Sequence, residues 1–200
     1  GEDSAAGRRV LVTGAAGFLG SHLTDRLLEE GHAVIGMDNF LTGSPDNIAH
    51  LLGHARYHFV QHDVTNFTYV EGALDAVLHF ASPASPIDYL EKPIQTLKVG
   101  SLGTHKTLGL AKAKGARFLT ASTSEVYGDS PESAGHITES FPIAPVNPYG
   151  VSKAAADLYI AGRARSAKLP FFITRAFSHT GPRRGEHRVV GEVLVEALAR

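Results

Sequence analysis

The chain has 200 residues, of which 43% are hydrophobic and 20% are charged, a composition that suits one globular domain, or a large domain with a fragment of another. Lys and Arg number 19 against 20 Asp and Glu, and the net charge of -1 offers no strong field for nucleic acid or an anionic membrane, so we expect neither as a partner. The lack of cysteine excludes disulfides, thiolate metal sites and cysteine nucleophiles, and fits a reducing compartment, by default the cytoplasm.

Apolar runs typical of β-strands alternate along the chain with segments of helical spacing. A polar stretch over residues 1–7 is expected to be a loose tail, and no apolar run approaches the roughly 18 residues of a membrane span. The predicted strands cover residues 9–13, 33–38, 57–60, 75–81, 117–122 and 171–177. The predicted helices cover residues 17–30, 94–114 and 148–168, with shorter ones near 46–52 and 189–200. This alternation predicts an α/β fold with a doubly wound parallel sheet.

Two glycines and two proline-containing loops punctuate this pattern. Gly31 and Gly115 stand where helix C-caps are expected. Segments 82–93 and 128–148 are predicted to be loops, and both follow strands, where the ligand loops of such sheets lie.

A glycine-rich turn comes directly after the first predicted strand. Gly14, Gly17 and Gly20 recur at every third position, with Phe18 and Leu19 between them, and open the helix predicted over 17–30. Glycines there permit a tight turn and let backbone N–H groups approach a pyrophosphate, and the helix N-terminus adds a partial positive charge. The turn therefore predicts a dinucleotide site, against the alternative of a turn that only packs a helix on a strand.

Asp38 closes the second predicted strand. Its carboxylate can accept hydrogen bonds from the adenosine ribose hydroxyls and would repel a 2′-phosphate. Asn39 follows with no arginine near it in the loop, so the pattern favours NAD over NADP as the cofactor. Asp63 and Val64, at the end of the third strand, are placed to hold the adenine edge, although an ordinary strand-terminal turn explains them equally well.

Tyr149 and Lys153 stand four residues apart in the helix predicted over 148–168, so both side chains share one face. A lysine ammonium beside a phenol favours the phenolate and lowers a pKa that is normally about 10. The pair suggests a general base that removes a hydroxyl proton. The spacing alone is a weak signal, because a solvated lysine one turn from a half-buried tyrosine shows the same pattern.

Together, Gly14-x-x-Gly17-x-x-Gly20 and Tyr149-x-x-x-Lys153 resemble the extended branch of the short-chain dehydrogenase/reductase superfamily, the NAD-dependent epimerases and dehydratases, over residues 8–200. Stretches 38–43, 80–86 and 121–128 make residues 8–134 similar to UDP-glucuronate decarboxylases. Stretches 136–140, 145–153 and 174–183 make residues 135–200 more similar to GDP-4-keto-6-deoxymannose reductases and GDP-mannose dehydratase-like proteins. The chain reads as a mosaic, a chimera of natural or engineered origin.

The resemblance implies a catalytic set of Thr123, Tyr149 and Lys153, with Lys153 also holding the nicotinamide ribose. Glu125 points to the same face as Thr123 if the chain stays extended there, and family members with chemistry beyond simple redox carry an acid at this point. The alternatives are a strand-end threonine that satisfies a backbone group and a solvated loop carboxylate. The expected catalytic residues are Thr123, Glu125, Tyr149 and Lys153, and the last two also belong to the expected cofactor site.

The chemistry implied by the family begins with oxidation at C4 of a nucleotide sugar. Tyr149 takes the proton of the 4-hydroxyl while hydride passes to NAD. If C6 is a carboxylate, the resulting β-keto acid loses carbon dioxide and the hydride returns, so UDP-glucuronate is the leading substrate. Otherwise the 4-keto sugar leads to a 4-epimerase, a 4,6-dehydratase or a 4-keto-reductase. Alternatives from other classes are an NAD-binding module without turnover and a redox-sensing regulatory protein.

Two further groups of residues are candidates for substrate binding. Ser82 and Ser85 can donate hydrogen bonds to a carboxylate or hydroxyl of the sugar, although the prolines around them also suit a simple turn. Arg175, with the segment 181–184, is placed to meet the phosphates of a sugar nucleotide, although a solvated surface arginine is as good an interpretation.

No metal is expected. His54, His58 and His62 recur every fourth residue, but the segment from 57 to 64 alternates like a strand, which separates the second and third of these histidines by roughly 13 Å. Such a distance does not suit ligands of one ion.

The resemblance also implies an assembly and a missing part. Helices near 94–114 and 148–168 match those of a four-helix dimer interface in the family, so a homodimer is expected. Family members are longer than this chain, and their C-terminal part builds much of the sugar site. Residues 1–200 are therefore expected to form a single NAD-binding Rossmann domain, with most of the substrate-binding domain absent.

Overall fold

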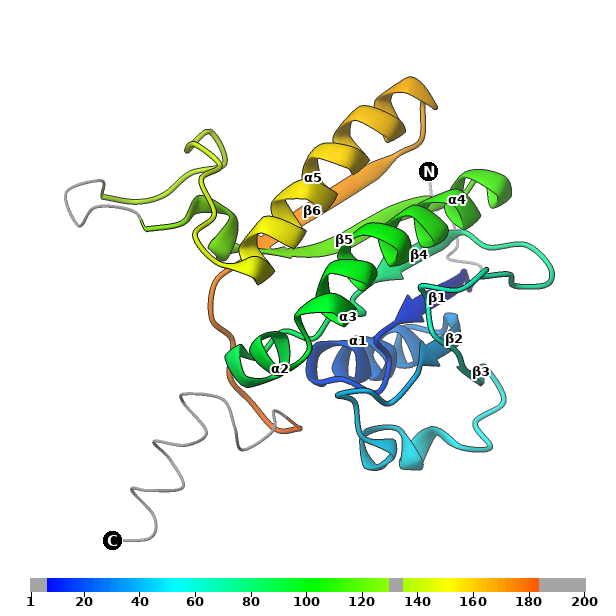
Figure 1. Cartoon of the computed structure of the whole chain (residues 1–200). Coiled ribbons are helices and arrows are strands. Elements are labelled where there is room, and N and C mark those ends of the chain that lie inside the picture. Colours follow the sequence, from blue (N-terminus) through cyan, green and yellow to red (C-terminus); the bar gives the residue numbers. More distant parts are fainter. Residues whose placement is uncertain (1–6, 130–134, 184–200) are drawn as a thin grey trace, which may run out of the picture.

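The structure, a computed structural model, describes residues 7–129 and 135–183 (Figure 1). Six parallel strands form one sheet in the order β3-β2-β1-β4-β5-β6. The strands are β1 (Arg9–Thr13), β2 (Ala33–Asp38), β3 (Tyr57–Gln61), β4 (Ala76–His79), β5 (Arg117–Thr123) and β6 (Phe171–Ala176). The α-helices are α1 (Phe18–Glu29), α2 (Pro86–Glu91), α3 (Pro93–Lys98), α4 (Thr104–Lys114) and α5 (Pro148–Ser166). The predicted doubly wound sheet is confirmed.

All six predicted strands are present, and the helices predicted over 17–30 and 148–168 correspond to α1 and α5. The single helix predicted over 94–114 is instead composite, because a π-helical turn, Val99–Gly103, separates α3 from α4. A Cβ on Gly100 would collide with the Ser152 hydroxyl of α5, so glycine permits the close packing at this turn. The short helix predicted near 46–52 is two 3-10 turns, Pro45–Asn47 and Ala49–Leu51.

The loop predicted over 82–93 is partly wrong, because α2 lies within it. Ser85 caps this helix, accepting a hydrogen bond from the Asp88 backbone N–H at 3.1 Å, and a proline occupies the first helical turn, where its missing N–H costs nothing. The loop predicted over 128–148 contains no regular helix or strand among its described residues before Pro148. Gly115 is the left-handed C-cap of α4, as predicted. The predicted tail, apart from Gly7, and the helix predicted near 189–200 lie outside the described residues.

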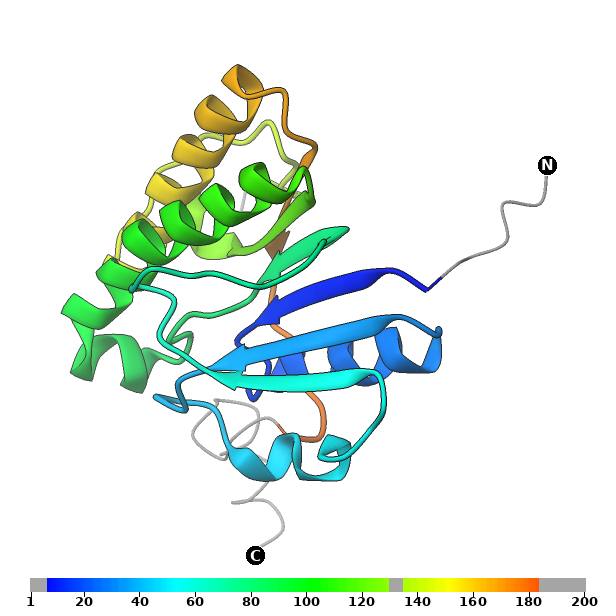
Figure 2. The ribbon, with the colours of Figure 1, turned by 90° about the vertical axis from the view of Figure 1, so that its right-hand side faces the viewer.

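The central strands β1 and β2 are buried on both faces, whereas the edge strands β3 and β6 are only partly buried. Figure 2 shows α4 and α5 on one side of the sheet and α1 on the other. Side chains alternate along β1 accordingly: Leu11 joins the cluster that contains Phe118 and Ile160, whereas Val10 and Val12 join the cluster that contains Leu28. Continuous apolar strands of this kind are typical of parallel sheets covered by helices. Among the described residues, no helix is long and apolar enough to span a membrane.

Candidate active site

The strand order reverses between β1 and β4, and in such sheets the ligand crevice lies outside the carboxyl ends of the strands at that point. A pocket opens there, between the glycine-rich turn and the loops that follow β2, β3 and β4. The predicted site residues that line it are Gly14, Gly17, Asp38, Asn39, Asp63, Val64 and Ser82. The tertiary structure thus brings together four segments that the sequence separates.

The glycine-rich turn is shaped by close backbone approaches. Gly14 adopts φ +70°, and a Cβ there would lie 2.8 Å from the backbone of Phe80 and Ala81 at the end of β4. A Cβ on Gly20 would collide with the Gly14 carbonyl, so α1 can start this near the turn only with glycine at position 20. Phe18 and Leu19 form the first residues of α1. The N–H groups of Ala15, Ala16 and Gly17 are engaged by Met37, Asp38 and Gly14, so the N–H groups of the turn that lack an intrahelical partner are those at the start of α1.

Asp38 fixes the turn and the following loop. It is 8% exposed, and its carboxylate accepts hydrogen bonds from the backbone N–H groups of Ala16 at 3.0 Å and Phe40 at 2.8 Å. Burial raises the pKa of Asp38, and these backbone hydrogen bonds oppose the rise. Phe40 has φ 58°, an unusual value for a bulky residue, and its hydrogen bond to Asp38 holds it there. Asp38 therefore shapes the loop and also lines the pocket.

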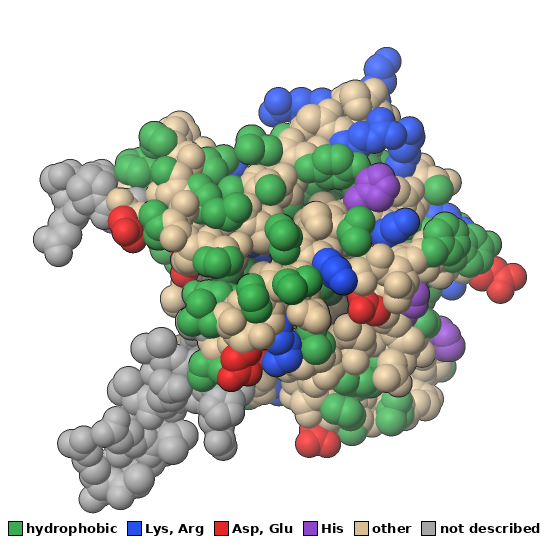
Figure 3. Space-filling model, viewed as in Figure 1, with side chains coloured by type: hydrophobic (Ala, Val, Ile, Leu, Met, Phe, Trp, Pro, Cys, Tyr) green, Lys and Arg blue, Asp and Glu red, His purple; other side chains and the backbone are tan. Residues whose placement is uncertain are grey.

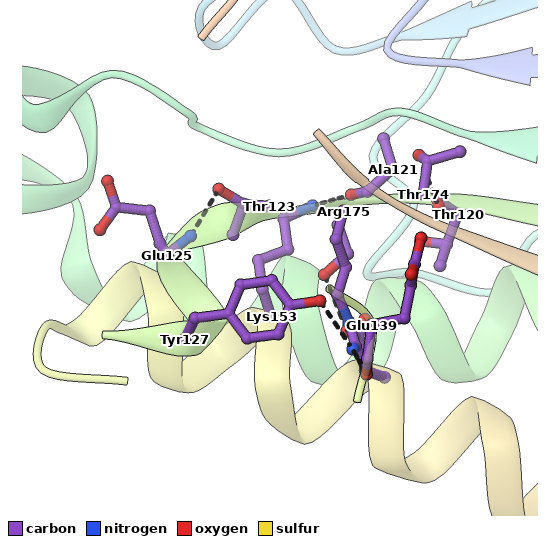
Figure 4. A network of polar contacts seen from close by, with 11 residues as sticks. Thr120, Ala121, Thr123, Glu125, Tyr127, Glu139, Lys153, Thr174 and Arg175 are labelled. Carbon is purple, nitrogen blue, oxygen red and sulfur yellow. Dashed lines mark hydrogen bonds and ion pairs between the residues drawn. The ribbon is translucent and has the colours of Figure 1, made fainter. Parts of the chain in front are cut away.

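The catalytic candidates gather beside this pocket, at the carboxyl end of β5 and the start of α5. Thr123 ends β5, is 8% exposed, and its hydroxyl accepts a hydrogen bond from the Glu125 N–H at 3.2 Å. Tyr149 lies in the first turn of α5 and is also 8% exposed. The Lys153 ammonium lies 5.8 Å from the centre of the Tyr149 ring and donates a hydrogen bond to the Ala121 carbonyl at 2.6 Å (Figure 4). Tyrosine and lysine thus share a face, as predicted.

Lys153 is 7% exposed, and burial lowers its pKa to about 8, while Asp157 opposes this shift. Its neighbour His79, on β4, shares a hydrogen bond of 2.8 Å with Thr13, and burial and the charge of Lys153 lower the pKa of His79 to about 3. His79 is therefore neutral at physiological pH. The Lys153 ammonium, 5.8 Å from the centre of the Tyr149 ring, is a positive charge available to a phenolate at Tyr149.

The N-terminus of α5 is tied to Glu125. Asn147 caps the helix by accepting a hydrogen bond from the Gly150 N–H at 2.8 Å, and its own amide donates to the Glu125 carboxylate at 2.6 Å. Glu125 is exposed and lies in a 3-10 turn (Ser124–Tyr127) that follows Thr123, so the extended chain on which its expected shared face with Thr123 depended is not present. This contact sets the acid beside the start of the helix that carries Tyr149.

Tyr89 is a site residue that the sequence did not indicate. Its ring stacks on that of Tyr149, with centroids 5.2 Å apart and an angle of 3° between the planes. Burial and the charge of Glu125 raise the pKa of Tyr89. The residue lies in α2, in a segment that was predicted to be a loop, so no helical pattern pointed to it.

The substrate-binding candidates differ in what they contact. Ser82 lines the pocket. The Ser85 hydroxyl is engaged in capping α2, since it also donates to the Asp88 carboxylate at 2.5 Å. Arg175 pairs through Nε with Asp157 at 3.0 Å and donates through Nη1 to the Tyr127 hydroxyl at 3.2 Å. These arrangements engage the hydroxyl of Ser85 and the guanidinium of Arg175 within the protein.

Arg183, from the segment predicted to meet phosphates, instead donates to Asp25 of α1 at 2.6 Å. Arg184 of the same segment lies outside the described residues. Within the described part of the chain, no group of three or more histidines and acids could hold a metal ion.

Residues 11–200 match the family described as GDP-mannose 4,6 dehydratase. UDP-glucuronic acid decarboxylase 1 of Xenopus tropicalis is 43% identical over 199 residues, which cover 96% of this chain and 46% of that protein. UDP-glucuronic acid decarboxylase 6 of Arabidopsis thaliana is 42% identical over 196 residues, covering 95% and 57%. The chain spans about half the length of these curated relatives.

Solved structures share the fold. The dTDP-glucose 4,6-dehydratase of Bacillus anthracis, in complex with NAD, superposes with a TM-score of 0.86 at 28% identity, over 96% of this chain and 62% of that chain. The UDP-glucuronic acid 4-epimerase of Bacillus cereus, in complex with UDP-glucuronic acid and NAD, superposes with a TM-score of 0.84 at 28% identity, over 96% and 63%.

Proposed function

The chain belongs to the GDP-mannose 4,6 dehydratase family, within the extended short-chain dehydrogenases/reductases, and on that premise we propose that it carries out NAD-dependent decarboxylation of UDP-glucuronate. One observation carries the proposal. The glycine-rich turn after β1 lies at the same carboxyl-end edge of the sheet as the side chains of Thr123, Tyr149 and Lys153. Relatives named UDP-glucuronic acid decarboxylase, about 40% identical over nearly the whole chain, support this choice of reaction.

The residues of the pocket fit NAD. The N–H groups of Phe18 and Leu19, in the first turn of α1, would hold the pyrophosphate, Asp38 the adenosine ribose and Lys153 the nicotinamide ribose. A Cβ at Gly14 would collide with the backbone of Phe80 and Ala81, just after β4, so only glycine lets the turn pass this close to the sheet. When bound, NAD supplies the hydride acceptor for oxidation and the hydride donor for the final reduction.

The protein's own groups move the protons. Tyr149, as the phenolate, takes the proton of the 4-hydroxyl, and the nearby charge of Lys153 stabilises that phenolate. Thr123 hydrogen-bonds the same substrate oxygen. The C4 ketone then stands β to the C6 carboxylate, so the C5–C6 bond breaks, carbon dioxide leaves, and the electron pair moves into the ketone. Glu125 serves the later step, in which C5 gains a proton.

A specific observation favours each of two alternatives. The Bacillus cereus structure is a 4-epimerase in complex with UDP-glucuronic acid, the same nucleotide sugar, so 4-epimerisation is a candidate outcome of the same oxidation, and a dehydratase or keto-reductase would also use these residues. The Ser85 hydroxyl and the Arg175 guanidinium, both expected to meet the substrate, are engaged within the protein, which favours an NAD-binding module that does not turn over a sugar. We assign residues 1–200 to a single NAD-binding Rossmann domain.

The decisive experiment incubates the protein with NAD and, separately, UDP-glucuronate, UDP-galacturonate, UDP-glucose and GDP-mannose. Products are identified by mass spectrometry and reduced cofactor is followed at 340 nm. Loss of carbon dioxide from UDP-glucuronate is expected. Release of UDP-galacturonate would establish the epimerase instead, and saturable NAD binding without any product would establish the module without turnover.

Tyr149→Phe tests the proposed base. The variant is expected to bind NAD like the parent and to lose hydride transfer, because the phenylalanine ring keeps the stack on Tyr89 but cannot take a proton. Tyr159→Phe makes the same change on the same helix, at a residue 39% exposed, and is expected to retain activity. Equal activity in Tyr149→Phe and the parent would refute the role.

We also propose that the protein is a homodimer through α3, α4 and α5. Figure 3 shows hydrophobic side chains gathered on the face that these helices form. The large apolar residues exposed there include Ile94, Leu97, Leu102, Val151 and Leu158, which are 45% to 64% exposed. A contiguous exposed apolar face on paired helices is typical of a subunit interface.

A further inference from the structure

Asp157 is a buried acid that the proposed mechanism leaves without a role. It lies in α5, four residues after Lys153 and therefore on the same helix face, and it is 2% exposed. A charged carboxylate is rarely buried this deeply unless it is paired. Its position beside a proposed catalytic lysine calls for an explanation.

One carboxylate oxygen of Asp157 is held from two strands. Oδ2 accepts hydrogen bonds from the Ser122 hydroxyl of β5 at 2.9 Å and from Arg175 Nε of β6 at 3.0 Å. Arg175 is held in turn, since its Nη1 donates to the Tyr127 hydroxyl at 3.2 Å and its guanidinium lies 5.4 Å from the Tyr127 ring centre. The carboxylate therefore has a fixed position on the β5 side of α5.

The other oxygen, Oδ1, is buried and has no hydrogen-bond partner among the described residues. A buried carboxylate oxygen left in this state is unfavourable unless a nearby positive charge compensates for it. Asp157 and Lys153 form hydrogen bonds with adjacent residues of β5. Lys153 Nζ donates to the Ala121 carbonyl at 2.6 Å (Figure 4), and Asp157 accepts from the Ser122 hydroxyl. These two contacts place both side chains just before Thr123.

We propose that Asp157 is a positioning residue that acts through Lys153 as its counter-charge, and that Ser122 and Arg175 hold it in that place. The role rests on the proposed function, since Lys153 matters there as the positive charge beside Tyr149. Arg175, predicted from the sequence to meet a substrate phosphate, acts in this arrangement within the protein.

The electrostatic setting agrees with this arrangement. Burial lowers the pKa of Lys153 to about 8, and the charge of Asp157 opposes that fall. Among residues 7–129 and 135–183, the other titratable and charged groups that act on the pair are Tyr149 of α5, His79 of β4 and Arg175 of β6. His79 is neutral above pH about 3, so Asp157 supplies the negative charge that keeps Lys153 protonated near neutrality.

The test follows the titration of Lys153 by NMR of the lysine side-chain carbon, with the resonance assigned by its loss in Lys153→Met. In Asp157→Asn the pKa of Lys153 is expected to fall by about one unit, a tenfold change in its proton affinity. In Arg175→Gln it is expected to rise, because a competing positive charge is lost. Ser122→Ala, which leaves every charge in place, is expected to change it least.

These opposite signs separate the proposal from a merely structural role, in which the variants would weaken folding and leave the pKa of Lys153 unchanged. An unchanged value in folded Asp157→Asn, or a fall in Arg175→Gln, would overturn the proposal. If neither variant folds, the parent protein is titrated instead, and the NMR signal of the Asp157 carboxyl carbon is followed. That signal must show a second inflection at the pKa of Lys153, and the absence of this inflection rejects the pairing. None of these measurements requires turnover, so a failure of the proposed reaction is distinguished from a failure of this inference.

Discussion

Replacing Gly14 with alanine tests whether the close approach of the turn to β4 supports cofactor binding. Gly14 has φ +70°, a backbone conformation that costs a residue with a Cβ about 1–2 kcal/mol. The added Cβ would also lie 2.8 Å from Ala81 N and from the Phe80 carbonyl carbon, and 2.9 Å from the Phe80 oxygen. These are backbone atoms that cannot rotate away, so overpacking adds about 1–2 kcal/mol more. We expect Gly14→Ala to lower the stability by about 2–4 kcal/mol.

For a chain of this size, that loss corresponds to a fall in Tm of roughly 4–16 °C. The turn would shift away from β4 and misplace its N–H groups, so NAD affinity is expected to fall by about tenfold or more. Urea denaturation followed by circular dichroism gives the stability, and isothermal titration calorimetry gives the NAD affinity.

Gly109→Ala is the matched control. Gly109 lies within α4, and a Cβ there would meet nothing within 4 Å. Alanine is favoured over glycine inside a helix, so this variant is expected to gain about 0.5–1 kcal/mol and to bind NAD like the parent. The reasoning fails if Gly14→Ala matches Gly109→Ala in both stability and NAD affinity.

Three further outcomes are expected. Burial lowers the pKa of Lys153 to about 8 from 10.5, so between these pH values the unfolded chain binds more protons than the folded protein. The stability of the parent relative to Lys153→Met should therefore rise with pH across that window. Urea denaturation at pH 7.5 and pH 9.5 measures this, and an equal difference at both would contradict it. Asp38→Asn removes the charge that repels a 2′-phosphate and should strengthen NADP binding in calorimetry; a parent that binds NADP as well as NAD would refute the assignment. Leu158→Glu should convert the proposed dimer to a monomer of 21.3 kDa in sedimentation. Leu52→Glu, at a similarly exposed leucine outside α3, α4 and α5, should not, and a monomeric parent would exclude the proposed dimer.

The cofactor half of the site could be predicted from local sequence because it depends on backbone geometry. Gly14 must adopt a positive φ, and Asp38 must end a strand, and both requirements are visible in the order of residues along the chain. The four-residue spacing of Tyr149 and Lys153 likewise fixes a shared helix face. Their roles in catalysis, and the mosaic of two subfamilies, stay predictions.

The contacts of the substrate-binding candidates could not be predicted in the same way, because these side chains contact residues that are distant in the sequence. Arg175 meets Asp157, 18 positions earlier, and Tyr89 stacks on Tyr149 from α2, a helix that begins at the Ser85 cap with a proline in its first turn. Side chains with several possible partners are assigned only when packing fixes the distances.

The sequence by itself determined the six strands, the glycine-rich turn and the family, because hydrophobic periodicity and glycine backbone requirements act over a few residues. The tertiary structure decided the strand order that places β1 beside β4 and so opens the pocket at their carboxyl ends. It also decided that Arg175 pairs with Asp157, since burial of a carboxylate on α5 requires a positive partner, and only the packing of α5 against β5 and β6 brings one within reach.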